Sequence, residues 1–223
     1  MTDPQKIARV HRSKAQAKQS YDRMSRFYDT FAGGFESKLR NLALERLQVT
    51  DGETVLEIGF GTGHCLEKIA ELIGGTGKAY GIDISSGMVE ITRKRLERAG
   101  IMQRVELYCG DAAEIPFDDD KFDAVFSSFS LELFDTPEIP EVLGEISRVL
   151  KPHGRIGVVS MSKQEADSLL TRLYEWFHET FPVYADCRPI YVEQSLKEAG
   201  FKIRHNEKVN LFGLPTEIVV GEK

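Results

Sequence analysis

The feature that most constrains the fold is a glycine turn between an apolar run and an amphipathic one. Residues 53–58, ETVLEI, have the composition of a buried strand. Three glycines follow at alternate positions, and apolar side chains then return at helical spacing: Gly59, Gly61, Gly63, then Leu66, Ile69, Ala70 and Ile73. A strand, a tight turn and a helix in this order present backbone N–H groups to a polar ligand, whereas a glycine turn alone can be merely a tight connection.

The alternation of strand and helix continues along the chain. Further strands are predicted at 78–83, 105–109, 122–128 and 155–160, and helical faces at 66–73, 89–99 and 139–150, the last closed by Pro152. Such an order is typical of a parallel sheet covered by helices on both faces. Two final strands, 201–210 and 216–221, predict an antiparallel hairpin. Without repeats or a low-complexity linker, residues 1–223 are predicted to form a single domain.

Composition narrows the class of protein. The chain has 223 residues, 41% apolar and 29% charged, with no run approaching the roughly 20 apolar residues of a membrane span. No signal peptide is evident, and the three cysteines form neither a disulfide framework nor a metal-ligand spacing, so we expect a cytoplasmic protein without a metal.

The net charge of −6 is unevenly spread, with +5 in residues 1–48 and −11 in the rest. The acidic body argues against a nucleic-acid-binding protein. The basic N-terminus is either a solvated end or a transient contact with anionic lipid.

Acidic residues at strand ends indicate the chemistry of the ligand. The dinucleotide fingerprint requires a glycine where His64 stands, and Glu57, two residues before the first glycine, would repel a pyrophosphate but suits an ammonium group. Asp83 ends the second predicted strand, where a carboxylate can accept from both ribose hydroxyls. Asp111 follows the third and is placed for an exocyclic adenine amine. Each acid alone could be a surface or capping residue, but three at one edge of a sheet predict a binding site.

The segments "VLEIGFGTG", "GIDIS", "CGDAAEIPF", "FDAVFSSFSLELF" and "LKPHGRIGVV" resemble the motif series of class I S-adenosylmethionine-dependent methyltransferases. The resemblance covers residues from about 50 to 160. It implies an α/β, Rossmann-like sheet of seven strands, mostly parallel with an antiparallel C-terminal strand and helices on both faces. It also implies the cofactor S-adenosyl-L-methionine, with S-adenosyl-L-homocysteine as product.

The resemblance assigns roles to individual residues. The glycine turn would wrap the methionine part of the cofactor, Glu57 its amino end, and Asp83 the ribose. Ile84 and Met88 would flank the adenine. The full implied cofactor set is Glu57, Gly59, Phe60, Gly61, Thr62, Gly63, Asp83, Ile84, Met88, Gly110, Asp111, Ala112, Ser127, Ser128, Phe129 and Tyr28.

The N-terminal segment "SYDRMSRFYDTF" resembles the entry to the ubiquinone/menaquinone-biosynthesis C-methyltransferases, with Tyr21-Asp22 and Tyr28-Asp29 seven residues apart. The Ser-x-Gly-x-His-x-x-Trp stretch usual in that group is absent, so another small or lipid-like acceptor stays equally open. We expect a helical lid over 1–48, a cofactor-binding core over 49–160, a substrate-covering helical segment over 161–200 and a strand pair over 201–223. Tyr21, with Trp176, Phe177 and Phe181, is a candidate for the acceptor pocket; the alternatives are core packing and a homodimer face.

Methyl transfer from a sulfonium is an in-line displacement, which needs alignment and exclusion of water more than a base. His64, His153, His178, Glu132 and Asp135 are available as bases, but no motif singles one out, so no catalytic residue is assigned. Cys109 is expected to be buried in a strand, which disfavours thiolate chemistry. The competing classes are a dinucleotide-dependent oxidoreductase and a catalytically silent cofactor-binding subunit.

Overall fold

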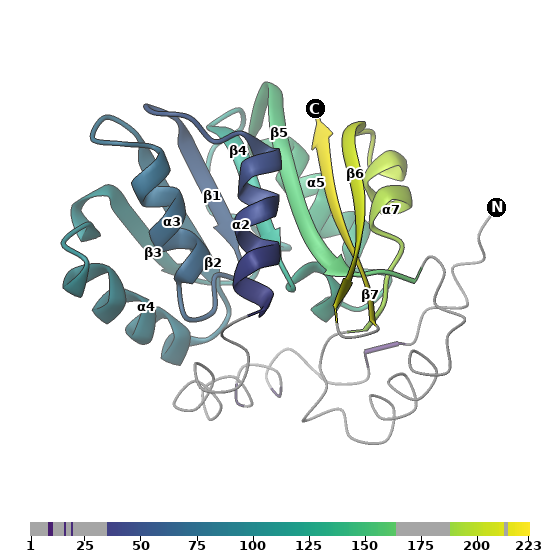
Figure 1. Ribbon diagram of the computed structural model, residues 1–223, viewed down its shortest axis with the longest axis horizontal. Coiled ribbons are helices and arrows are strands. Elements are labelled where there is room, and N and C mark those ends of the chain that lie inside the picture. The colour runs from purple at the N-terminus through teal and green to yellow at the C-terminus, as the bar shows by residue number, and fades with distance from the viewer. Residues whose placement is uncertain (1–8, 11–15, 17–18, 20–34, 164–187, 212–213) are drawn as a thin grey trace.

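The computed structural model describes residues 9–10, 16, 19, 35–163, 188–211 and 214–223. Its centre is one seven-stranded sheet of order β3-β2-β1-β4-β5-β7-β6 (Figure 1). The strands are β1 (Thr54–Ile58), β2 (Lys78–Asp83), β3 (Val105–Cys109), β4 (Phe122–Ser128), β5 (Leu150–Met161), β6 (Lys202–Leu211) and β7 (Leu214–Glu222). Neighbours among β1 to β5 pair in parallel, and β7 runs antiparallel to both β5 and β6. The predicted fold class and the closing hairpin are confirmed.

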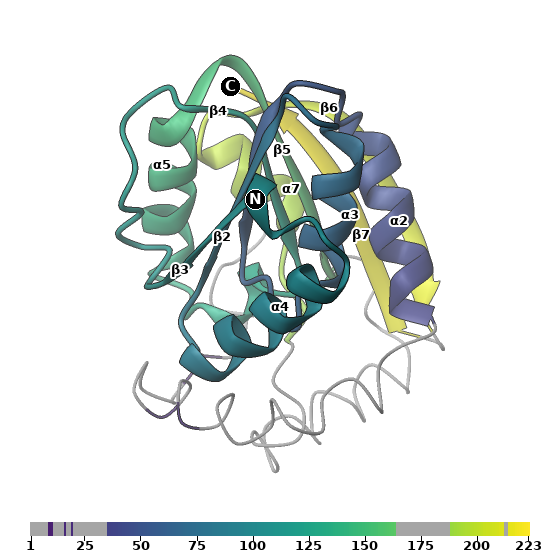
Figure 2. The same cartoon turned by 90° about the vertical axis from the view of Figure 1, so that its left-hand side faces the viewer.

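Helices cover both faces of the sheet (Figure 2). On one face, α2 (Phe35–Leu47), α3 (His64–Leu72) and α4 (Ser86–Arg98) pack through side chains such as Leu44, Ile69 and Leu96. On the other face lie α5 (Ile139–Val149) and α7 (Val192–Glu198), with the short 3-10 helix η4 (Leu131–Leu133). Parallel strands buried on both sides need continuous apolar runs, which explains the burial of nearly all of β1 and β2. None of the described helices is both long and apolar enough to cross a bilayer.

One predicted boundary is wrong. The sequence pattern extended a helix to Leu150 and began the next strand at Arg155, but α5 ends at Val149 and β5 begins at Leu150. Leu150 has an extended backbone and pairs with Phe122, and the register shifts before Ala124. His153 takes a positive φ of 64° within this stretch. In the sequence, Pro152 indicates a turn rather than a strand, because proline has no backbone N–H to donate to a neighbouring strand.

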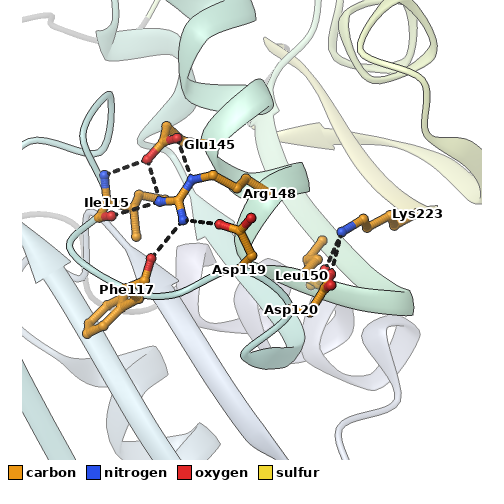
Figure 3. Close-up of polar contacts among 8 residues, drawn as sticks. All are labelled: Ile115, Phe117, Asp119, Asp120, Glu145, Arg148, Leu150 and Lys223. Carbon is orange, nitrogen blue, oxygen red and sulfur yellow. Dashed lines mark hydrogen bonds and ion pairs between the residues drawn. The ribbon is translucent and has the colours of Figure 1, made fainter.

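Arg148, in the last turn of α5, ties that helix to the segment that leads from β3 to β4 (Figure 3). Its guanidinium donates to the carboxylates of Glu145 and Asp119 at 2.7–2.8 Å. It also donates to the carbonyls of Phe117 at 2.8 Å and Ile115 at 2.9 Å. Glu145 in turn accepts the N–H of Ile115 at 2.9 Å. The segment from Ile115 to Asp119 is thereby held against α5.

The strand order reverses between β1 and β4, since β2 and β3 lie on one side of β1 and β5 on the other side of β4. The carboxyl ends of these strands face the lower side of Figure 1, where the turns after β1, β2, β3 and β4 converge. In open parallel sheets this is the position at which ligands bind.

Candidate functional site

A cavity of about 170 Å³ lies at this edge of the sheet. Every turn that the sequence singled out contributes to its wall. The predicted residues that line it are Glu57, Gly59, Phe60, Gly61, Thr62, Asp83, Ile84, Met88, Gly110, Asp111, Ala112, Ser128 and Phe129. Gly63 and Ser127 lie behind this wall rather than on it. Residues as far apart in the sequence as Glu57 and Phe129 are thus brought to one cavity.

The glycine turn adopts a backbone that side chains would obstruct. Gly59, Gly61 and Gly63 have φ values of 66°, 53° and 82°. A Cβ on Gly59 would lie 2.0 Å from the hydroxyl oxygen of Ser130, and one on Gly63 would lie 2.5 Å from a methyl of Thr92. Glycine is therefore required both for the left-handed conformation and for the close approach of neighbouring elements. Gly63, which caps α3, shapes the turn without reaching the cavity.

Asp83 connects two of the turns. Its carboxylate accepts the N–H of Gly61 at 2.9 Å and that of Ser85 at 2.9 Å, and only 9% of the residue is exposed. It therefore fixes the glycine turn against the end of β2 while lining the cavity. Each carboxylate oxygen has a second lone pair, so acceptance from ribose hydroxyls remains compatible with these contacts.

Glu57 is a buried acid beside the cavity. The residue is 2% exposed, and among the described residues its Oε2 has no hydrogen-bond partner. Burial, with a smaller contribution from the negative charge of Asp83, raises its pKa well above the ordinary value, while Arg40 and Cys65 oppose the rise. A carboxylate so placed is stabilised by a cation, and an ammonium group supplies both a charge and a donor.

Arg40, which the sequence reading missed, projects from α2 to the same cavity. With Glu57 it presents one positive and one negative group at one end of the site, which matches the carboxylate and ammonium of an amino acid. Nothing in the helix 35–47 marked Arg40, because its role depends on the docking of α2 against the sheet. Further lining residues were not assigned to the cofactor site from the sequence: Val10, Ile58, His64, Cys65, Ile82, Ser130, Leu133, Phe134 and Glu138.

The end of the cavity near β2 and β3 is mainly apolar. Ile84, Met88 and Ala112 line it, and Met88 and Ala112 are 2% and 5% exposed. Asp111 lies at this end, and its Oδ1 accepts the N–H of Ala113 at 3.0 Å. Apolar walls with a carboxylate at the rim can hold a purine and its exocyclic amine.

The residues that the sequence offered as available bases, and the Cys109 thiol, take different positions. His64 lines the cavity, with its Nε2 3.0 Å from Arg95. His153 is at the opposite end of β5, 87% exposed at the side chain. Glu132 is buried off the cavity wall, and Asp135 is engaged with Arg9. The expected burial of Cys109 is wrong: the thiol is exposed, because β3 is an edge strand that ends there.

Several predicted residues lie outside the described part of the chain. These are Tyr21, Tyr28, Trp176, Phe177, Phe181, His178 and Cys187. The predicted lid over 1–48 and the substrate-covering segment over 161–200 fall largely in the same ranges. Their roles stay predictions.

Known proteins share both the fold and part of the sequence. Residues 55–154 match the family model described as a methyltransferase domain. The chain is 34% identical over 177 residues to the ubiquinone/menaquinone biosynthesis C-methyltransferase UbiE of Pseudomonas fluorescens (strain Pf0-1), covering 79% of this chain and 66% of that protein.

Two solved structures share the fold. The cyclase SpnF has a TM-score of 0.79 at 23% identity, covering 97% of this chain and 98% of SpnF. An S-adenosylmethionine-dependent methyltransferase from Aquifex aeolicus has a TM-score of 0.62 at 22% identity, covering 100% and 99%.

The sheet order, the glycine turn and the acids at the strand ends define an α/β domain of the Rossmann-like methyltransferase class. With the domain match and the relatives, they show that the chain carries a class I methyltransferase domain that resembles UbiE-like proteins. The match spans just under two thirds of the length of those relatives.

Proposed function

We propose that the chain transfers a methyl group from S-adenosyl-L-methionine to a small apolar or lipid-like acceptor of the quinol type. The observation that carries the cofactor assignment is the buried Oε2 of Glu57, which has no hydrogen-bond partner in the described part of the chain and lies beside the cavity that Arg40 also lines. Relatives named for ubiquinone/menaquinone biosynthesis and for demethylmenaquinone methylation support a quinone-type acceptor. Phe129, Leu133 and Phe134 give the β4 side of the cavity an apolar wall, which suits such an acceptor.

When bound, the cofactor supplies an electrophilic methyl group with an excellent leaving group. The residues of this chain then have three tasks. Glu57 and Arg40 hold the amino-acid end, Asp83 and Asp111 hold the two ends of the adenosine, and the apolar wall excludes water from the line of attack. No described residue is assigned as a base. Cytoplasmic localisation, a monomeric or dimeric state and membrane contact through the basic N-terminus remain predictions.

Binding tests separate the roles of the two acids. We expect Glu57→Gln to weaken S-adenosylmethionine about 10- to 100-fold, because a neutral amide cannot compensate the ammonium. The same variant should bind 5′-methylthioadenosine, which lacks the amino-acid end, as wild type does. Asp83→Asn should weaken both ligands. Isothermal titration measures all four affinities, with Glu97→Gln on the exposed surface of α4 as control. Equal affinity of Glu57→Gln and wild type for S-adenosylmethionine would reject the assignment of Glu57.

The acceptor requires an experiment in the host. Deletion of the gene should cause accumulation of a quinone species that is lighter by one methyl group, detected by mass spectrometry of lipid extracts. An unchanged quinone profile would point to another acceptor, such as a phospholipid amine or a small molecule methylated on O or N. Cofactor binding without turnover of any of these would indicate a catalytically silent subunit.

A further inference from the structure

Asp135 receives an unusual number of donors from a distant part of the chain. The Nε of Arg9 lies 2.9 Å from Oδ1 and 3.0 Å from Oδ2, and its Nη2 lies 2.6 Å from Oδ2. The backbone N–H of Val10 donates to Oδ1 at 3.0 Å, and that of Thr136 at 2.9 Å. These contacts lower the pKa of Asp135, so the group is charged at neutral pH. A guanidinium that donates to a carboxylate through two nitrogens fixes the relative orientation of the two groups as well as their distance.

The residues around this contact belong to the cavity wall. Val10, next to Arg9, lines the cavity, and so do Leu133 and Phe134, just before Asp135. The ion pair therefore places Val10 beside Leu133 and Phe134, which lie more than a hundred residues away in the sequence.

Arg188 supports the same turn from the other side. It donates through Nη2 to the carbonyl of Phe134 and through Nη1 to the hydroxyl of Thr136 at 3.1 Å. Arg188 is fully buried, and its positive charge also acts on Asp135. The turn is thus fixed, and Arg9 docks onto a rigid carboxylate rather than ordering it.

We propose that Asp135 is a positioning residue that holds Val10 against the Leu133–Phe134 wall and so keeps the β4 side of the cofactor cavity closed. The identity of the ligand rests on the proposed function, but the contact itself does not. The side chain of Arg9 is 57% exposed and that of Asp135 is 19% exposed, so salt screens the pair in part. The ligand should consequently leave faster when the pair is weakened.

The probe is S-adenosyl-L-homocysteine, and the readout is its dissociation rate in a displacement experiment by stopped flow. We expect Asp135→Asn and Arg9→Met each to raise that rate at least about fivefold, and the double variant to raise it no further, since both remove one interaction. Raising the salt concentration should speed release from wild type more than from either variant. Arg204→Met, which breaks the exposed pair with Glu222 on β6 and β7, is the matched control and should leave release unchanged.

A second readout does not need the ligand. Trypsin should cut the Arg9–Val10 bond of Asp135→Asn faster than that of wild type, because a neutral amide no longer holds the Arg9 guanidinium by its charge, although its oxygen can still accept the Val10 N–H. Wild-type rates of both ligand release and cleavage in Asp135→Asn would overturn the positioning role. Faster cleavage in a chain that binds no S-adenosylhomocysteine would support the contact and reject the proposed function instead.

Discussion

Glu132 is a charged residue in a turn whose burial cannot be inferred from the sequence. It follows β4 in the turn that also carries the apolar wall of the cavity, yet it is fully buried. Neither of its carboxylate oxygens has a hydrogen-bond partner within the described residues. Burial raises its pKa to about 7, against smaller opposing effects of the Ser160 hydroxyl, the Met161 backbone and the charge of Arg188. A carboxyl group of this kind makes stability depend on pH.

The direction of that dependence follows from the raised pKa. Between pH 4.5 and about 7 the unfolded chain loses the Glu132 proton before the folded one, so stability falls as pH rises and the loss is complete above about 7. Its size is about 3 kcal/mol. Gln cannot ionise, so we expect the free energy of unfolding of Glu132→Gln, relative to wild type, to rise by about that amount from pH 5 to pH 8.

Urea denaturation at both pH values measures the difference, and Glu97→Gln, exposed on α4, is the control. A constant gap between Glu132→Gln and wild type across this range would contradict the assignment.

Residues at strand ends were predictable, and residues brought in by docking were not. Asp83 and Asp111 stand at the carboxyl ends of two apolar strands. Because these strands pair in parallel, their carboxyl ends lie at the same edge of the sheet, and the positions of both acids follow from the sequence. Arg40 reaches the cavity from a helix that packs across β5, and Arg9 reaches Asp135 across 126 residues. Such contacts depend on tertiary packing, which leaves no local pattern.

At the scale of elements, the guanidinium of Arg148 is the main polar link between α5 and the segment from Ile115 to Asp119 (Figure 3). We expect Arg148→Met to lower the free energy of unfolding by about 2–4 kcal/mol, because it removes the charged partner of Glu145 and the side-chain donor to two backbone carbonyls. Arg148→Lys should recover only part of this loss, because an ammonium cannot form the fork.

Chemical denaturation of the three proteins gives these values. Arg98→Met, in the exposed last turn of α4, serves as the reference for removal of a surface arginine. A loss for Arg148→Met no greater than that of Arg98→Met would mean that the loop is held by its apolar contacts instead.

The elements themselves were predicted to within about three residues where the apolar residues recur with a clear helical or strand period. The strands of the cofactor-binding half are short apolar runs bounded by Gly or Asp, and β2, β3 and β4 match their predicted ranges. The start of β5 was missed because its first residues carry a proline and a glycine and pair irregularly with β4. Strand pairing overrode the local preference for a turn.

At the scale of the whole molecule, cofactor binding should raise global stability. S-adenosylmethionine at 100 times its dissociation constant adds about 2.7 kcal/mol to the free energy of unfolding if only the native state binds it. For a chain of 223 residues this corresponds to a rise in Tm of about 5–11 °C. Differential scanning fluorimetry measures the shift. A larger shift with NADH than with S-adenosylmethionine would favour an oxidoreductase.

The position of β7 has a consequence for biosynthesis. β7 follows β6 in the chain but lies between β5 and β6 in the sheet, so among the strands that the structure describes β6 pairs with β7 alone. While the ribosome adds the roughly 50 residues between β5 and β7, at about 5–20 residues per second, the flank of β5 stays unpaired for several seconds. A bare strand flank templates aggregation. The nascent polypeptide is therefore prone to aggregate during these seconds, and a holdase chaperone that covers the flank of β5 would increase the yield of folded protein.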